Sequence, residues 1–258
     1  ISDELPEGIS VFLSVTGTEG NVLTGNLSGT YPPATYRITG DLTIADGDTA
    51  YLQAGTEFLF DGQVNFNIYG TLKAIGTESD SIIFDNFGNE RWRGFTLENA
   101  SDETTFEYVR ISGAENDDGG GMYLNSSNPT LTHVTISNNT AEYGGGMRLN
   151  FSNPTLTHVT ISNNAANYEG GGMRLYYSDL TLTNVTIESN ISFYGGGMLL
   201  YSSNPKLTHV TIANNYGEYL GGGMYLLLSN PILTNSILWD NYTQSIHISS
   251  GTPIISYS

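Results

Sequence analysis

Apolar and polar residues alternate along much of the chain in short runs, separated by Gly, Pro, Asn or Asp. This period of two is typical of β-strands that bury one face. After Gly121, Met122 and Leu124 are apolar, whereas Tyr123 and Asn125 alternate with them. No helical period is visible, and β-branched residues dominate. We therefore expect an all-β protein.

The same stretch continues into two further strands. Residues 126–129 read Ser-Ser-Asn-Pro and predict a turn, because Pro cannot continue a hydrogen-bonded ladder. Leu131 and Ile136 are then expected to face inward, with threonines outward. The alternation slips by one residue at His133, which predicts a bend. The next turn is at Asn139, so each unit contains three short strands, closed by four or five variable residues.

Close copies of this unit follow one another. The motif Gly-Gly-Gly-Met recurs at steps of 25, 26, 25 and 26 residues and accounts for all five methionines. A period of this size indicates stacked units, each burying the apolar face of its neighbour. Equivalent strands would pair in parallel about 4.8 Å apart. The expected inward columns are Met122/Met147/Met173/Met198/Met224, Leu124/Leu149/Leu175/Leu200/Leu226 and Ile136/Ile161/Ile187/Ile212/Leu238.

The turn at the end of the third strand carries an asparagine in every unit. Stacked amides can donate to one another and so satisfy polar groups at a buried corner. We expect a structural ladder of Asn139, Asn164, Asn190, Asn215 and Asn241.

These motifs resemble the repeats of right-handed parallel β-helix surface proteins. The closest resemblance is to the polymorphic outer-membrane protein type, whose units carry GGA followed by an aliphatic residue, and F-x-x-N. Here they read GGGM and Ile136-x-x-Asn139, Ile161-x-x-Asn164, Ile187-x-x-Asn190 and Ile212-x-x-Asn215. The likeness covers residues 111–241, with Met after the glycines and Ile in place of Phe. It implies a secreted or surface-displayed protein, often adhesive.

The coil pattern extends beyond the regular repeats. We predict an irregular leader or cap over residues 1–35, then a right-handed parallel β-helix of three-strand coils over 36–258, with regular repeats at 111–241. About nine coils would form a rod of about 45 Å. The last residues read as a coil cut in mid-strand, so we expect the native chain to continue past Ser258; the alternative is that this end docks on something.

Charge narrows the choice of partners. The formal net charge is −18, with only eight Lys and Arg, so nucleic acid or an anionic membrane is not expected as a partner. The absence of Cys excludes disulfides, and no membrane-spanning run is visible, so no membrane insertion is expected. An acidic surface fits secretion, high salt or divalent ions. No cofactor is expected.

Candidate chemistry is sparse. Acidic residues within the repeats are scattered and share no column with a base, so we expect no catalytic residue. His133, His158 and His209 share a column with Asn, which favours a structural hydrogen bond over a metal site. Arg148 and Arg174 are expected to be outward and solvated. The enzyme alternative, a carbohydrate-active β-helix, would use the mixed-charge group of the earlier coils: Asp61, Asp85, Arg91 and Arg93.

Three further sets of residues recur on outward positions. Thr columns suit exposed strands, although regular Thr arrays on solenoids also resemble ice-binding surfaces. Tyr143, Tyr168, Tyr194 and Tyr219 are expected to stack at a corner. The strand after Gly-Met turns apolar and aromatic toward the C-terminus, and soluble monomers seldom expose such a patch without a use. The predicted contact surface is Tyr176, Leu199, Tyr201, Tyr225 and Leu227, flanked by Tyr177 and Leu228.

The sequence therefore favours a non-enzymatic structural or adhesive β-helix module, extracellular or at a cell surface. The contact surface could meet a glycan, another subunit or a further part of the chain. Self-association, head to tail or through the aromatic patch, would build a fibre.

Overall fold

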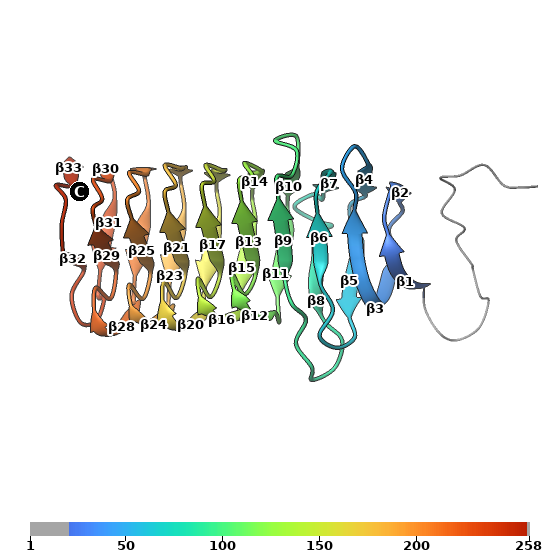
Figure 1. Cartoon of the computed structure of the whole chain (residues 1–258), viewed down its shortest axis with the longest axis horizontal. Helices are drawn as coiled ribbons and strands as arrows, with labels where there is room; N and C mark the ends of the chain where they lie inside the picture. Colours follow the sequence, from blue (N-terminus) through green and yellow to red (C-terminus); the bar gives the residue numbers. More distant parts are fainter. Residues whose placement is uncertain (1–20, 257–258) are drawn as a thin grey trace, which may run out of the picture.

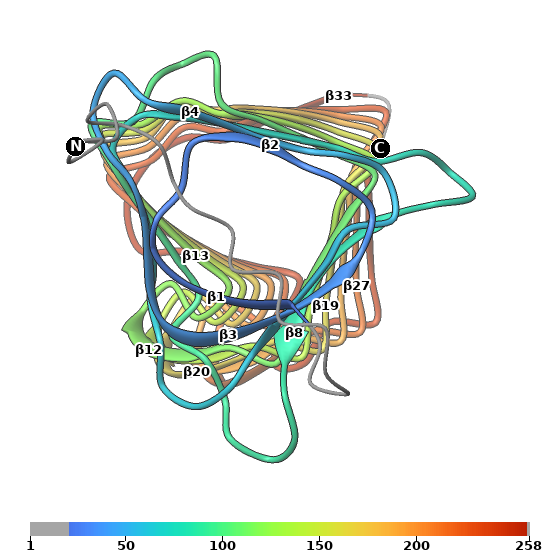
Figure 2. The ribbon, with the colours of Figure 1, turned by 90° about the vertical axis from the view of Figure 1, so that its right-hand side faces the viewer.

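The computed structural model describes residues 21–256, which wind into a parallel β-solenoid of about nine turns (Figure 1). Each strand pairs in parallel with its equivalent in the next coil, for example Met147 with Met173. Viewed along the axis, the coils superpose around a closed core (Figure 2). The predicted all-β parallel solenoid is confirmed. The described residues contain no helix long and apolar enough to cross a membrane.

The strands form three long faces, called sheets 1 to 3, and one short outer ladder; sheets 1 and 3 are continuous with each other through β3 (Thr35–Ile44). Sheet 1 contains the second half of β3, then β6 (Phe66–Ile68), β9 (Phe95–Glu98), β13 (Met122–Asn125), β17 (Met147–Asn150), β21 (Met173–Tyr176), β25 (Met198–Tyr201), β29 (Met224–Leu227) and β32 (Ile246–Ile248). Sheet 2 contains β2 (Gly29–Tyr31), β4 (Thr49–Leu52), β7 (Thr71–Ile75), β10 (Thr105–Glu107), β14 (Thr130–Thr132), β18 (Thr155–Thr157), β22 (Thr181–Thr183), β26 (Lys206–Thr208), β30 (Ile232–Thr234) and β33 (Ile254–Ser256).

Sheet 3 contains the first half of β3, then β5 (Glu57–Phe60), β8 (Ile82–Asn86), β11 (Val109–Ser112), β15 (Thr135–Ser137), β19 (Thr160–Ser162), β23 (Thr186–Glu188), β27 (Thr211–Ala213) and β31 (Ile237–Trp239). The outer ladder contains β12 (Glu115–Asp118), β16 (Thr140–Tyr143), β20 (Ala165–Glu169), β24 (Ile191–Tyr194) and β28 (Tyr216–Leu220). Strand β1 (Asn21–Asn26) pairs along β3, which joins sheets 1 and 3.

The first coil starts earlier than predicted. Residues 21–31, assigned to an irregular leader, instead form β1 and β2, which pair with β3 and β4. The reason is burial: Leu27 and Tyr31 are both almost fully buried and cover the first turn as part of a coil. Residues 32–35 connect β2 to the start of β3, and residues 1–20 of the predicted leader lie outside the described residues.

The core follows the predicted inward columns. All five methionines and the matching leucines are fully buried, and only Leu238 in the last isoleucine position is partly exposed. Coils before residue 110 fill the same space with aromatic rings. The rings of Phe84, Phe95 and Phe106 meet edge to face at 4.9 and 5.4 Å.

The variable residues that close each unit form a fourth strand, which the sequence pattern did not reveal. The outer ladder is linked to sheet 1 by the glycine triplet. Gly144 has a φ of 69°, in the left-handed region that favours glycine. A Cβ on Gly145 would lie 2.4 Å from the carbonyl oxygen of Ala165. The triplet therefore lets the chain reverse tightly and places the outer ladder beside the outer face of sheet 1.

Two buried polar ladders run along the rod. Each ladder asparagine donates from Nδ2 to Oδ1 of the next, at 3.0–3.1 Å from Asn139 to Asn241, and also to a backbone carbonyl. The second ladder was not anticipated: the backbone N–H of one serine donates to Oγ of the next. Its members, all fully buried, are Ser127, Ser152, Ser178, Ser203 and Ser229. Column alignment of the Ser before each Asn or Asp could have found it.

Candidate binding cleft

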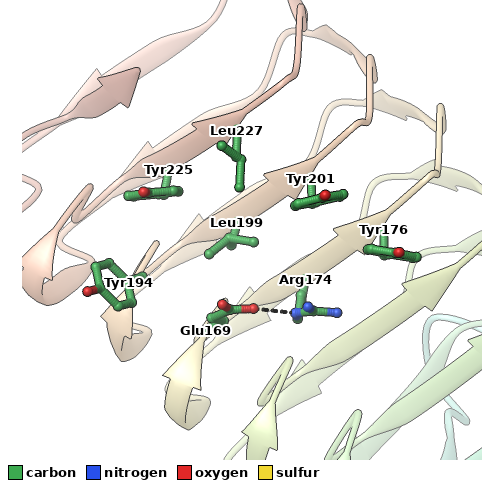
Figure 3. A pocket seen from close by; sticks show the side chains of 8 residues that line it. All are labelled: Glu169, Arg174, Tyr176, Tyr194, Leu199, Tyr201, Tyr225 and Leu227. Carbon is green, nitrogen blue, oxygen red and sulfur yellow. Dashed lines mark hydrogen bonds and ion pairs between the residues drawn. The ribbon is translucent and has the colours of Figure 1, made fainter. Parts of the chain in front are cut away.

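A cleft of about 370 Å³ runs along the outer face of sheet 1, beside the outer ladder (Figure 3). Strands β21, β25 and β29 supply its floor, and β20 and β24 supply one wall. The lining residues are Glu169, Arg174, Tyr176, Tyr194, Leu199, Tyr201, Tyr225 and Leu227. All five residues of the predicted contact surface therefore line one cleft, together with Glu169, Arg174 and Tyr194, which were not predicted to belong to that surface.

The wall of the cleft is built by the residues immediately before each glycine triplet. In the register of the outer ladder, Tyr143 pairs with Glu169, and Glu169 with Tyr194. The four tyrosines therefore do not form one continuous column, although neighbouring rings still meet in pairs, Tyr143 with Tyr168 at 5.5 Å and Tyr194 with Tyr219 at 5.6 Å. The extra residue of the 26-residue units produces a register shift within the ladder, so Tyr168 and Tyr219 are displaced to exposed positions, and only Tyr143 and Tyr194 remain in the column.

The two arginines of sheet 1 are not solvated as expected, since their side chains are only 18% and 14% exposed. Arg148 forms an ion pair with Asp118, and Arg174 Nε donates to Glu169 Oε2 at 2.6 Å. The Arg174 guanidinium also lies 5.2 Å from the ring centre of Tyr143. Burial, together with the neighbouring Arg174, lowers the pKa of Arg148 to about 10, whereas Glu169 opposes the shift.

The tyrosines of the cleft present edges rather than faces. Tyr176 and Tyr201 stack with centroids 5.0 Å apart, and Tyr194 meets Tyr225 edge to face at 5.4 Å. Figure 3 shows the rings of Tyr176, Tyr201 and Tyr225 lying across the direction of the rod. Leu199 points outward as predicted but is only 4% exposed, because it lies between these side chains at the bottom of the cleft.

The sequence profile described as "Right handed beta helix region" matches residues 93–257, more than half of the chain. The chain belongs to the right-handed β-helix family. Neither a curated protein nor a solved structure matches it.

One rim of the cleft in this β-helix carries large residues at turn positions. Phe151, Tyr177 and Leu228 follow β17, β21 and β29 directly and are 46–56% exposed. All three have φ of 49–52°, a conformation that costs a bulky residue energy and that Gly or Asn tolerates better. Phe151 and Tyr177 stack at 5.3 Å. Ser126 and Ser202 adopt the same conformation at this turn, so the coil imposes the strain, and large residues accept it in three of the five repeats.

The mixed-charge group proposed for an enzyme is not brought together in the β-helix. Asp61 accepts from Arg37 Nε at 2.9 Å, and Arg93 donates to Gln63 at 2.8 Å. Asp85 and Arg91 do line a second cleft of about 400 Å³. However, Arg91 Nη1 donates to the backbone carbonyls of Ala114 and Asn138 and so supports the turns.

The histidine column occupies a bend, as the slipped alternation predicted. His133, His158, Asn184 and His209 all have φ of 53–55°, which explains why His alternates with Asn there. His158 and Asn184 share a hydrogen bond of 3.2 Å. Residues 21–256 hold no group of three or more His, Cys, Asp and Glu side chains that could bind a metal. The Thr columns that begin at Thr132 and Thr135 lie on sheets 2 and 3, on either side of this bend.

Proposed function

We propose that this chain is a non-enzymatic extracellular β-helix module with a structural or adhesive role. The observation that carries the proposal is the cleft on sheet 1, which gathers Tyr, Leu and one Arg–Glu pair from three consecutive coils. The rod supplies rigidity through its backbone and Asn ladders, and the cleft supplies the contact surface. A function of this kind needs a fixed surface and no reacting group.

The location and subtype rest on sequence features. The net charge of −18 and the lack of Cys suit an extracellular chain, and the GGGM and I-x-x-N motifs resemble the surface-displayed polymorphic outer-membrane protein type. We extend the proposal to a cell surface on this basis.

Incubation with neutral and acidic polysaccharides, followed by measurement of new reducing ends or unsaturated products, tests the non-enzymatic role. We expect no cleavage. Cleavage that is lost in Asp85→Asn or Arg91→Gln would contradict the proposal and favour the second candidate, a carbohydrate-active β-helix. The observation in favour of that candidate is the second cleft, where Asp85 and Arg91 lie together.

Self-assembly is a distinct version of the structural role. Negative-stain electron microscopy at increasing concentrations distinguishes discrete rods from fibres. If fibres form through the cleft, Tyr201→Glu should abolish them and leave the circular dichroism spectrum unchanged. Fibres that survive this substitution would exclude the cleft as the assembly interface.

A further inference from the structure

The cleft contains hydrogen-bonding groups that the described part of the chain leaves unused. Tyr176, Tyr194, Tyr201 and Tyr225 line it, and none of their hydroxyls forms a hydrogen bond with another group of residues 21–256. A phenol hydroxyl can both donate and accept. Four such groups around one small cleft can therefore match a ligand that also donates and accepts at several points.

The charged pair at one end of the cleft is internally neutral. Glu169 Oε2 accepts from Arg174 Nε at 2.6 Å. Within the described residues, Glu169 Oε1 and the two Nη groups of Arg174 have no further hydrogen-bond partner. The pair thus offers one free acceptor beside fixed donors, with no net charge. It suits an uncharged partner with adjacent hydroxyls better than an anion or a cation.

The middle of the cleft is apolar. Leu199 is 4% exposed at its floor, and Leu227 lies beside it. The volume of about 370 Å³ is at the low end of small-ligand sites, which begin at roughly 300 Å³. A suitable ligand is therefore small in cross-section, with one apolar face and a hydroxylated edge.

We propose that the cleft binds a neutral sugar unit of a glycan, an inference that rests on the adhesive function proposed above. The C–H face of the sugar lies on Leu199 and Leu227, and its hydroxyls meet the Glu169–Arg174 pair and the tyrosine hydroxyls. Because Tyr176 and Tyr201 occupy each other's faces, the apolar contact comes from the leucines and not from ring stacking. The net charge of −18 disfavours both an acidic polysaccharide and a second copy of the chain.

Ligand-observed NMR and calorimetry with the intact chain test this inference. The probes are maltotriose, cellotriose, mannotriose and triacetylchitotriose, with trigalacturonate as the acidic comparison. We expect at least one neutral trisaccharide to bind with a Kd of about 1 mM or tighter. Trigalacturonate should bind at least tenfold more weakly at low salt.

Variants locate the site. Tyr201→Phe and Tyr225→Phe keep the rings and remove one hydroxyl each, so affinity should fall about two- to tenfold. Leu227→Glu places a charge beside the floor and should abolish binding. The matched control is Tyr219→Phe, an exposed tyrosine of the outer ladder that does not line the cleft; its affinity should equal that of the unmodified protein.

The inference would be overturned if no neutral probe binds at about 20 mM, or if trigalacturonate binds as well as the neutral probes. It would also be overturned if Tyr201→Phe, Tyr225→Phe and Leu227→Glu all leave the affinity unchanged. Concentration-dependent dimerisation that Leu227→Glu abolishes would also overturn it, because the occupant would then be a second copy, while the structural role would stand. Conversely, a neutral glycan that is bound in the cleft and also cleaved would support the sugar site and contradict the non-enzymatic role.

Discussion

One inward column of sheet 1 runs almost the full length of the rod and changes character part-way. It holds Phe66 and Phe95 in the earlier coils, and Met122 through Met224 in the later ones. The neighbouring outward columns change in the opposite sense. They hold Thr96 and Glu98 on β9, but Leu199, Tyr201 and Tyr225 on β25 and β29. The earlier coils thus bury aromatic rings, and the later coils display them.

The physical basis of the difference is the regularity of the coils. Units of 25 and 26 residues bring identical side chains into line about 4.8 Å apart, a spacing that slim aliphatic side chains and amides fill well. The earlier coils have unequal loops, and their core is filled by rings of different orientation meeting edge to face. Regular stacking also aligns the outward residues, so the later half presents a cleft lined by repeated Tyr and Leu positions of consecutive coils.

The largest expected effect tests packing in that inward column. Phe95 touches Phe66, Phe84, Trp92 and Phe106, so Phe95→Ala should lower the free energy of unfolding by about 3–5 kcal/mol. In the same column, Met173→Leu should cost less than about 1.5 kcal/mol because volume is conserved. Denaturant unfolding followed with hydrogen exchange would assign the loss to each half. Equal losses of unfolding free energy in the two variants would contradict the expected difference between the aromatic coils and the methionine coils.

The second effect tests the polar ladder of the regular half. Asn190→Ala leaves the backbone N–H of Asn164 without an acceptor in a buried corner, and Nδ2 of Asn164 keeps only the carbonyl of Ile136. We expect a loss of about 3 kcal/mol, since each unsatisfied buried group costs about 1–3 kcal/mol. The control is Asn163→Gly, which removes an exposed side chain at φ 55° and should change stability by less than about 0.5 kcal/mol. A small loss for Asn190→Ala would mean that water replaces the amide.

The third effect tests the strained rim of the cleft. Leu228 is exposed at φ 52°, and Leu228→Asn should stabilise the protein by about 0.5–1 kcal/mol because Asn tolerates this conformation. Leu227→Asn, in the adjacent strand position, should give no such gain. A rise in Tm for the first variant only would show that the rim residue is retained at a cost to stability. A fall in Tm for Leu228→Asn would mean that its apolar contacts outweigh the strain.

The smallest effect concerns alkaline pH at the first coil. Burial raises the pKa of Tyr31 above its ordinary value of 10.0. The unfolded chain therefore loses this proton at lower pH than the folded chain, so stability falls as pH rises above about 10. Hydrogen exchange should show the first coil opening before the methionine coils, and Tyr31→Phe should reduce this dependence. An equal increase in hydrogen-exchange rate in both halves of the rod would contradict this prediction.

Parts of the candidate site could be read from the sequence, and parts could not. Columns separated by 25 or 26 residues placed Tyr176 beside Tyr201, and Leu199 beside Tyr225, because a parallel register repeats the strand pattern. The same spacing predicted the wrong strand positions for Tyr168 and Tyr219, because the extra residue of the 26-residue units is accommodated by a register shift in the outer ladder. The pairing of Glu169 with Arg174 was missed because it depends on the chain folding back through a glycine triplet.

The sequence by itself determined the solenoid, its inward columns and its Asn ladder, because period-two alternation and a fixed repeat length are local properties that stacking only reproduces. The tertiary structure decided the rest. It added the outer ladder, converted solvated arginines into half-buried ion pairs, and turned an exposed leucine into the floor of a cleft. These features depend on which outer segment lies over which strand of sheet 1. That arrangement is set by backbone contacts between coils, which cannot be read from the sequence of one repeat.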